Sequence, residues 1–201
     1  MQISILSESA ITDIRVHQNL VKKILFPKRI AFKLLEKVNF HGKNDLLSNL
    51  PTAISVLTNK FSELDLIIIV VDSDKLPASQ QKKEILEIIK KVDCFPINKI
   101  VVGVAQKNIE AWLLTDENAL NKVLLLKIKG VFKKAENIIK PKIKMRELYG
   151  SYCKFLKEQD KKPLMYSDFL VEISNNVDIN NLCKKSSSFN SFAKEVRNAA
   201  R

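Results

Sequence analysis

Histidine and cysteine, which supply most zinc ligands in proteins, are scarce in this chain. There are two histidines, His17 and His41, and the three cysteines, Cys94, Cys153 and Cys183, are far apart and form no Cys-x-x-Cys pair. This scarcity argues against a zinc or iron site built on histidine and against a cysteine-ligated zinc site. An odd number of separated cysteines also argues against a disulfide framework and is typical of a protein from a reducing cytoplasm.

Long apolar runs are missing as well. No stretch approaches the roughly 18 consecutive apolar residues of a membrane-spanning helix. The first residues show neither the basic start nor the apolar run of a secretion signal. Hydrophobic residues make up 46% of the 201 residues and charged residues 28%, which is typical of a globular protein with a substantial core. We therefore expect a cytoplasmic protein with no membrane partner.

Acidic residues are outnumbered, with 22 Asp and Glu against 34 Lys and Arg, for a formal net charge of +12. A positive balance of this size favours an anionic partner, nucleic acid before membrane. The alternative is that a proteome rich in Lys, Ile and Asn gives many proteins a basic surface.

The excess positive charge is concentrated in residues 121–162. This segment, about a fifth of the chain, holds thirteen Lys or Arg and four Asp or Glu, a net charge of +9. A merely solvated face would carry interspersed acids, so the segment is predicted to contact a phosphate backbone. The residues predicted to bind nucleic acid are Lys43, Lys133, Lys134, Lys142 and Lys144.

The most informative stretch is residues 66–71, six apolar and mostly β-branched residues that run without alternation into Asp72-Ser73-Asp74. Such a run is typical of a strand covered on both faces, as in a parallel sheet. If the strand persists to its end, Asp72 and Asp74 point the same way at the edge where α/β sheets bind ligands. Their oxygens suit Mg²⁺ or Mn²⁺. A polar turn that simply ends the strand is the alternative.

Strands and helices alternate along the first half of the chain. Three further segments are predicted to be strands: 2–6, 34–40 and 99–105. Helices are predicted to begin near Thr12 or Asp13, at Pro51 and at Pro77. This order predicts an α/β fold with a mainly parallel sheet flanked by helices. We divide the chain into an α/β core, 1–120, and a basic, mainly helical C-terminal part packed on it, 121–201.

Two more acids follow predicted strands: Glu8 follows the first, and Glu110 follows 99–105. Parallel strands end at one edge, so these carboxylates can meet Asp72 and Asp74 if the strands are neighbours. Carboxylates that converge repel one another, so at least one should have a raised pKa. Glu8 is a candidate metal ligand or general base. Glu110 is a candidate metal ligand or outer-shell group, or simply an acid favoured at a helix start.

Glu8 after a first strand and Asp72-x-Asp74 after a later one resemble the acidic motif of the Toprim fold. This fold is the catalytic domain of topoisomerases, bacterial primases and overcoming-lysogenization-defect nucleases. The glycine that usually follows the glutamate is Ser9 here.

The chain is more closely similar to a family of small standalone Toprim-like proteins, a domain of unknown function often encoded beside ATPases in bacterial phage-defence loci. The similarity rests on four segments: Gly42-Lys43, Val70-Val71-Asp72-Ser73-Asp74, Ile109-Glu110-Ala111-Trp112-Leu113-Leu114-Thr115-Asp116 and Ser187-Ser188-Phe189-Asn190-Ser191-Phe192. It implies a Toprim-like core and an ATPase partner protein.

Taken together, the residues and the resemblance predict a divalent-metal-dependent nuclease that acts in phage defence. Asp72 and Asp74 would hold Mg²⁺ or Mn²⁺, Glu8 would be a further ligand or the general base, and Glu110 would complete a second metal position.

Other functions stay open. The chain could be a non-catalytic nucleic-acid-binding or regulatory subunit of an ATPase-containing defence complex. Haloacid-dehalogenase-like phosphatases also begin with strand-Asp-x-Asp, but they usually have Thr or Val where Leu76 stands here. A glycosyltransferase that uses Asp-x-Asp for a sugar nucleotide is similarly remote. The sequence does not distinguish DNA from RNA, and it leaves open whether the chain forms a homo-oligomer.

Overall fold

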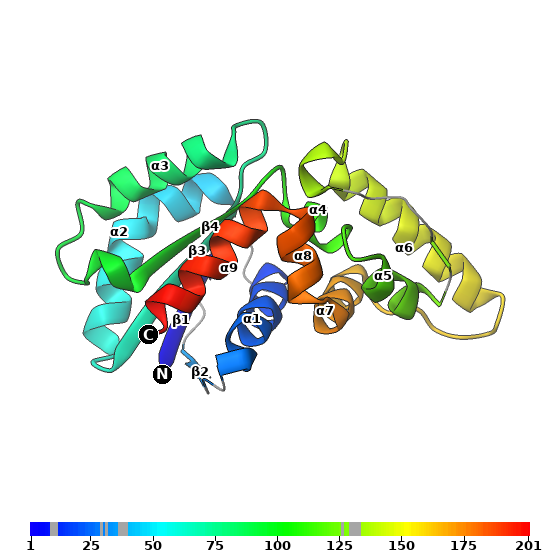
Figure 1. Cartoon of the computed structure of the whole chain (residues 1–201), viewed down its shortest axis with the longest axis horizontal. Coiled ribbons are helices and arrows are strands. Elements are labelled where there is room, and N and C mark those ends of the chain that lie inside the picture. The colour runs from blue at the N-terminus through cyan, green and yellow to red at the C-terminus, as the bar shows by residue number, and fades with distance from the viewer. Residues whose placement is uncertain (9–11, 29, 31, 36–39, 126, 129–133) are drawn as a thin grey trace.

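A four-stranded, all-parallel sheet forms the centre of the protein (Figure 1). The computed structural model describes the whole chain except residues 9–11, 29, 31, 36–39, 126 and 129–133. The strands are β1 (Gln2–Ser7), β2 (Lys33–Leu34), β3 (Leu64–Asp72) and β4 (Ile100–Ala105), in the order β2-β1-β3-β4. Each residue of 66–71 is at most 2% exposed, so the unbroken apolar run forms the predicted central strand.

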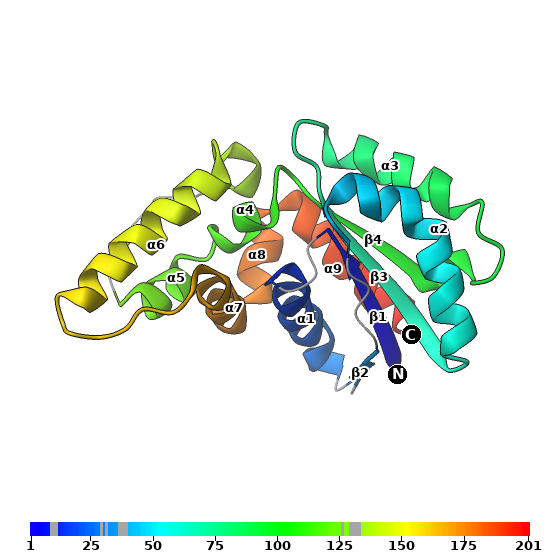
Figure 2. The same ribbon diagram turned by 180° about the vertical axis from the view of Figure 1, so that it is seen from behind.

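Helices cover both faces of the sheet (Figures 1 and 2). The helices α2 (Lys43–Lys60) and α3 (Ala78–Ile89) share one apolar cluster with Ile67 and Ile69 of β3. The helices α1 (Thr12–Leu25) and α9 (Ser187–Ala199) share the other cluster, with Ile68 and Val70. Successive side chains of a strand point to opposite faces, so both faces of β3 must be apolar. This requirement explains why its sequence does not alternate.

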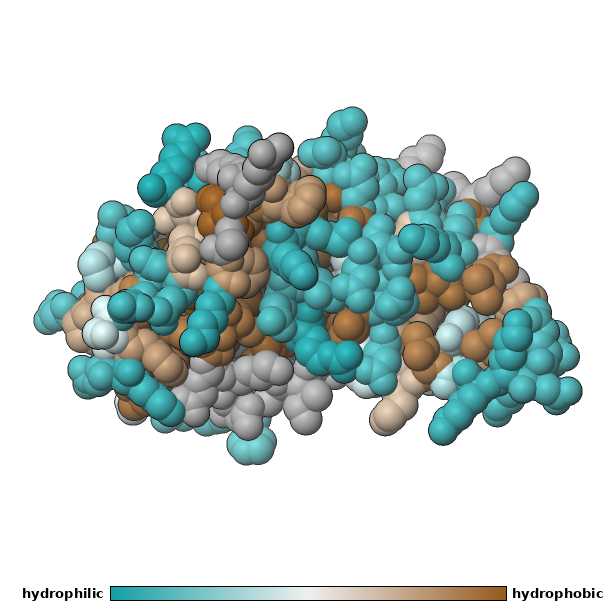
Figure 3. All heavy atoms as spheres, turned by 90° about the horizontal axis from the view of Figure 1, so that it is seen from below, coloured by the Kyte–Doolittle hydropathy of each residue, from teal (hydrophilic) through white to brown (hydrophobic). Residues whose placement is uncertain are grey.

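The remaining helices extend from the sheet to the far end of the molecule, where α6 lies (Figures 1 and 2). They are α4 (Ile109–Leu113), α5 (Glu117–Leu124), α6 (Pro141–Lys157), α7 (Tyr166–Asn176) and α8 (Ile179–Lys185). The described residues also form single 3₁₀ turns at Phe26–Lys28, Ile97–Lys99 and Ala135–Asn137. Among the described residues, no helix has the length and apolar character needed to cross a membrane. Hydrophilic side chains make up much of the face in Figure 3, with apolar residues in several groups among them.

Two predicted elements differ from the structure. The helix expected to begin at Pro51 begins at Lys43 and contains Pro51. Gly42 precedes it with a φ of 99°, a conformation that glycine adopts readily. Burial of apolar residues along α2 offsets the hydrogen bond that Pro51 cannot donate. The strand predicted over 34–40 is limited to Lys33–Leu34 among the described residues, and 36–39 lie outside them.

The single tryptophan, Trp112, joins two distant segments in the core. Trp112 is fully buried, with its ring centroid 5.1 Å from that of Phe189 and 5.8 Å from that of Phe192. Its indole N–H donates a hydrogen bond of 2.9 Å to Ser188 Oγ. The segments 109–116 and 187–192, on which the family resemblance partly rests, therefore pack directly on each other.

Gly103 in β4 lies close to the ring of Phe192, and a Cβ atom added to it would be 2.6 Å from Phe192 Cδ2. Because the ring must move, we expect Gly103→Ala to lower the free energy of unfolding by about 1–3 kcal/mol, measured by urea denaturation. Gly150→Ala in α6 is the matched control. Its Cβ would meet no atom within 4 Å, so this variant should gain about 0.5–1 kcal/mol. Equal stability of the two variants would contradict this account of the packing.

His17 in α1 is 3% exposed, and neither ring nitrogen has a hydrogen-bond partner in the part of the chain that the structure describes. Burial lowers its pKa from 6.5 to about 3. As the pH falls below 6.5, the unfolded chain therefore takes up a proton that the folded protein excludes.

We expect this difference to lower the free energy of unfolding by about 2 kcal/mol between pH 7 and pH 5. In His17→Leu this loss should disappear, which denaturation curves at several pH values would reveal. Other titrating groups contribute equally to the wild type and to His17→Leu. If the free energy of unfolding falls with pH in the same way in both proteins, His17 is not the source of the loss.

Candidate functional site

The carboxyl ends of β1 and β3 bring Glu8 and Asp72 together, although 63 residues separate them in the sequence. The two strands are hydrogen-bonded neighbours, with Ser7 opposite Val70. Glu8 follows the last residue of β1, and its Oε1 accepts a hydrogen bond of 2.8 Å from the backbone N–H of Asp72. Glu8 and Asp72 therefore lie at the same edge of the sheet and are joined by a hydrogen bond from backbone to side chain.

The Asp72 side chain connects three elements. Its Oδ1 accepts a hydrogen bond of 2.9 Å from the N–H of Ile109, the first residue of α4. Its Oδ2 lies 3.3 Å from Nζ of Lys142 in α6. The Asp72 side chain is only 14% exposed. The lysine that contacts it lies 70 residues further along the chain.

Asp74 belongs to a turn and not to the strand. β3 ends at Asp72, and Asp74 has a φ of 52°, so strand alternation does not set its direction. Its carboxylate is paired with Nζ of Lys43, which also donates to the Asp72 backbone carbonyl at 3.1 Å. Residues 72–74 therefore form a polar turn that ends the strand, and the same residues carry the charged groups of the candidate site.

Glu8 and Glu110 both have a pKa raised above the ordinary value, and burial is the largest cause in each case. For Glu8, the hydrogen bond from Asp72 and the charge of Lys43 oppose the rise, whereas Asp74 adds to it. Glu110 is 5% exposed, and Lys142 lowers the pKa of both glutamates. Lys142 is therefore the charge that the two acids share.

Tyr166 of α7 also interacts with Glu110, after Lys142 and Arg146 of α6. Burial raises the pKa of the Tyr166 hydroxyl, and the charge of Glu110 raises it further. Within the described residues, neither Glu110 Oε2 nor the Tyr166 hydroxyl makes a hydrogen bond of regular geometry. Tyr166 is thus a group of α7 that acts on the buried Glu110 carboxyl.

Of the five lysines predicted to bind nucleic acid, Lys43 and Lys142 contact the acids directly. Lys144 lies on α6 and pairs with Glu147 at 2.9 Å. Lys134 is exposed beside the 3₁₀ turn 135–137, and Lys133 lies outside the described residues.

Lys107 is part of this site but was not predicted from the sequence. Its backbone N–H donates to Ser73 Oγ at 2.8 Å, and its carbonyl accepts from the N–H of Asp74 at 2.9 Å. Its Nζ donates to the carbonyls of Glu136 at 3.0 Å and Ile138 at 2.6 Å. Its position just after β4, like that of the acids after their strands, was the available signal.

The donor chemistry of Glu8, Asp72 and Asp74 suits a hard divalent cation. Among the described residues, however, no three His, Cys, Asp or Glu side chains are grouped closely enough to hold a metal ion. Two ammonium groups lie instead against the aspartates. The residue types therefore fit Mg²⁺ or Mn²⁺, and binding would require the aspartates to exchange lysine contacts for the ion.

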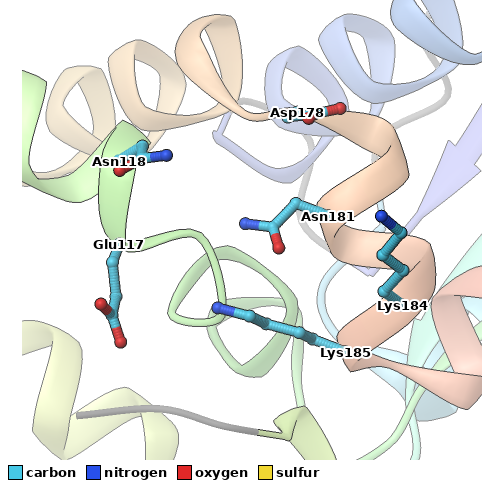
Figure 4. A pocket seen from close by; sticks show the side chains of 6 residues that line it. All are labelled: Glu117, Asn118, Asp178, Asn181, Lys184 and Lys185. Atoms are coloured by element: carbon cyan, nitrogen blue, oxygen red, sulfur yellow. The ribbon is translucent and has the colours of Figure 1, made fainter. Parts of the chain in front are cut away.

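Two cavities of about 320 Å³ lie elsewhere. The first lies between α5 and α8, and Figure 4 shows Asn181 and Lys185 extending into it from α8. Its lining residues are Glu117, Asn118, Asp178, Asn181, Lys184 and Lys185. The second runs along β4 between α3 and α9, where Lys82 is paired with Glu195. Neither cavity is lined by the acids that follow the strands.

Searches of protein-family models, of curated proteins and of solved structures found no match to this chain.

The shared position of Lys142 gives a testable prediction. Its positive charge favours the ionised form of both carboxylates, so Lys142→Gln should raise the pKa of Glu8 and of Glu110. Carbon-detected NMR titration of the side-chain carboxyl groups in EDTA would measure both. Lys144→Gln is the control, because Lys144 pairs with Glu147. A shift of neither glutamate in Lys142→Gln would place this lysine outside the site.

Proposed function

We propose that the protein is a divalent-metal-dependent nuclease that hydrolyses phosphodiester bonds in nucleic acid. The observation that carries this proposal is the contact between Glu8 and Asp72 at the carboxyl ends of adjacent parallel strands, with Lys43 and Lys142 on the neighbouring carboxylates. Acids at this edge can bind a metal, and lysines beside them can bind the phosphate.

Each residue has a role that follows from its surroundings. Asp72 and Asp74 would hold Mg²⁺ or Mn²⁺, which when bound polarises the scissile phosphate. Glu8 would be a further metal ligand or the general base that takes a proton from the attacking water, because its carboxylate lies against Asp72 at the same sheet edge. Lys43 and Lys142 would move from the aspartates to phosphate oxygens. Glu110 would be a further metal ligand.

The partner and the biological setting of this proposal come from the sequence resemblance. Small standalone Toprim-like proteins are often encoded beside ATPases in phage-defence loci, so we include an ATPase partner and a role in phage defence. The net charge of +12 supports nucleic acid as the substrate.

A second function is favoured by a specific observation. Both aspartates are paired with lysines, and no group of three acids suited to a metal occurs among the described residues. This arrangement would suit a non-catalytic nucleic-acid-binding or regulatory subunit, in which the same lysines bind phosphate without hydrolysis.

Asp74→Asn is the sharpest test of the nuclease. Asn tolerates the left-handed conformation at position 74, and the Asp74 side chain is 55% exposed, so the fold should stay intact. We expect Asp74→Asn and Asp72→Asn to weaken Mn²⁺ binding, measured by calorimetry, and plasmid cleavage by about 100-fold or more. Asp168→Asn is the control, because Asp168 pairs with Arg15 of α1.

Unchanged Mn²⁺ affinity in both site variants would contradict the metal site. Nucleic-acid binding without cleavage by the wild type, with or without the ATPase, would identify the regulatory subunit instead.

A further inference from the structure

Two isoleucines at the start of α6 are exposed to an unusual degree. Ile139 is 80% exposed and Ile143 is 52% exposed, whereas the adjacent Ile138 is 7% exposed. Ile143 lies in the first turn of α6, and Ile139 directly precedes Lys140, the N-cap residue of that helix, which has a φ of 50°. Burial of a large apolar side chain is usually favourable, so this exposed pair is a candidate contact surface.

The backbone that presents these isoleucines is held in place. Nζ of Lys107 donates to the carbonyls of Glu136 and Ile138, just before Ile139. The Glu136 carboxylate in turn accepts hydrogen bonds from the backbone N–H of Ser187 at 2.8 Å and from the Ser186 hydroxyl at 3.1 Å. Their exposure is therefore set by an anchored turn and not by a loose end.

Lysines alternate with this apolar pair. Lys140 and Lys142 lie between Ile139 and Ile143, and Lys144 follows them. Lys142 Nζ lies 3.3 Å from Asp72 Oδ2, so the segment that carries the isoleucines is joined to a candidate catalytic acid. A ligand that covers this surface must therefore offer apolar area and closely spaced negative charge at once.

We propose that Ile139 and Ile143 contact the faces of unpaired bases, and that the substrate is nucleic acid with unpaired bases beside the scissile phosphodiester. This inference rests on the proposed function. Phosphate contacts by lysine serve paired and unpaired strands alike. In a paired duplex the base faces are stacked, and apolar side chains reach them only by unstacking the bases, which is unfavourable. Unpaired bases offer their faces without that cost.

The small size of the surface favours this occupant over a protein. Two side chains provide far less apolar area than a stable protein interface, which buries about 800 Å² on each partner. An anionic membrane would offer negative charge and apolar area, but it would bring its headgroups against the carboxylates of the neighbouring site.

The test compares the wild type with the double variant Ile139→Ser and Ile143→Ser. Fluorescence anisotropy in EDTA would measure binding to a labelled DNA single strand, to the paired duplex and to the same duplex with central mismatches, over a range of salt concentrations. We expect the wild type to prefer the unpaired DNAs. The double variant should bind them about tenfold more weakly, with the same salt dependence and unchanged duplex binding. Val56→Ser, at a 53% exposed position on α2, should behave as the wild type.

Equal binding of paired and unpaired DNA by the wild type, or an equal loss for all DNAs in the double variant, would overturn the inference. The metal-binding and cleavage tests of Asp72 and Asp74 would still stand, so the two failures are distinguishable. Binding to phosphatidylserine vesicles that the double variant loses, while its DNA preference is unchanged, would also overturn it and identify a membrane contact.

Discussion

Burial of β3 on both faces is the constraint on which the rest of the structure depends. The strand can be covered only if it lies inside a sheet with helices on either side, as α2 and α3 lie on one face and α1 and α9 on the other. The parallel neighbours β1 and β4 then end at the same edge as β3. The place where Glu8 meets Asp72 is therefore a consequence of how the apolar residues are covered.

At that edge, acids and lysines keep each other in place. The sequence leads one to expect carboxylates that repel one another, and the pKa of Glu8 is indeed raised. Burial is nevertheless the largest cause, and Asp74 contributes less than the opposing hydrogen bond from Asp72. Lysines 43 and 142 reduce the repulsion that the acids would otherwise exert. A negatively charged ligand could compete with the acids for these lysines.

The extent to which the sequence predicts the structure depends on whether a feature is local. The apolar run 66–71 predicts its strand directly, because a strand that is buried on both faces requires an unbroken apolar sequence. Proline is common in first turns, so the sequence predicts that α2 starts at Pro51. The actual start is marked by the positive φ of Gly42, which leaves no periodic pattern in the sequence. The contact of Lys142 with Asp72 depends on how α6 packs, and no local pattern encodes it.

The fit of Phe192 against Gly103 has a consequence for how the protein is made. On the ribosome, β4 is synthesised well before α9, the helix that covers it. Until α9 is made, Gly103 lacks the ring of Phe192, and the indole of Trp112 lacks both Phe189 and Phe192, the side chains that they contact in the folded protein. This side of β4 is therefore covered only after α9 has been made, and until then it is open to association with other chains.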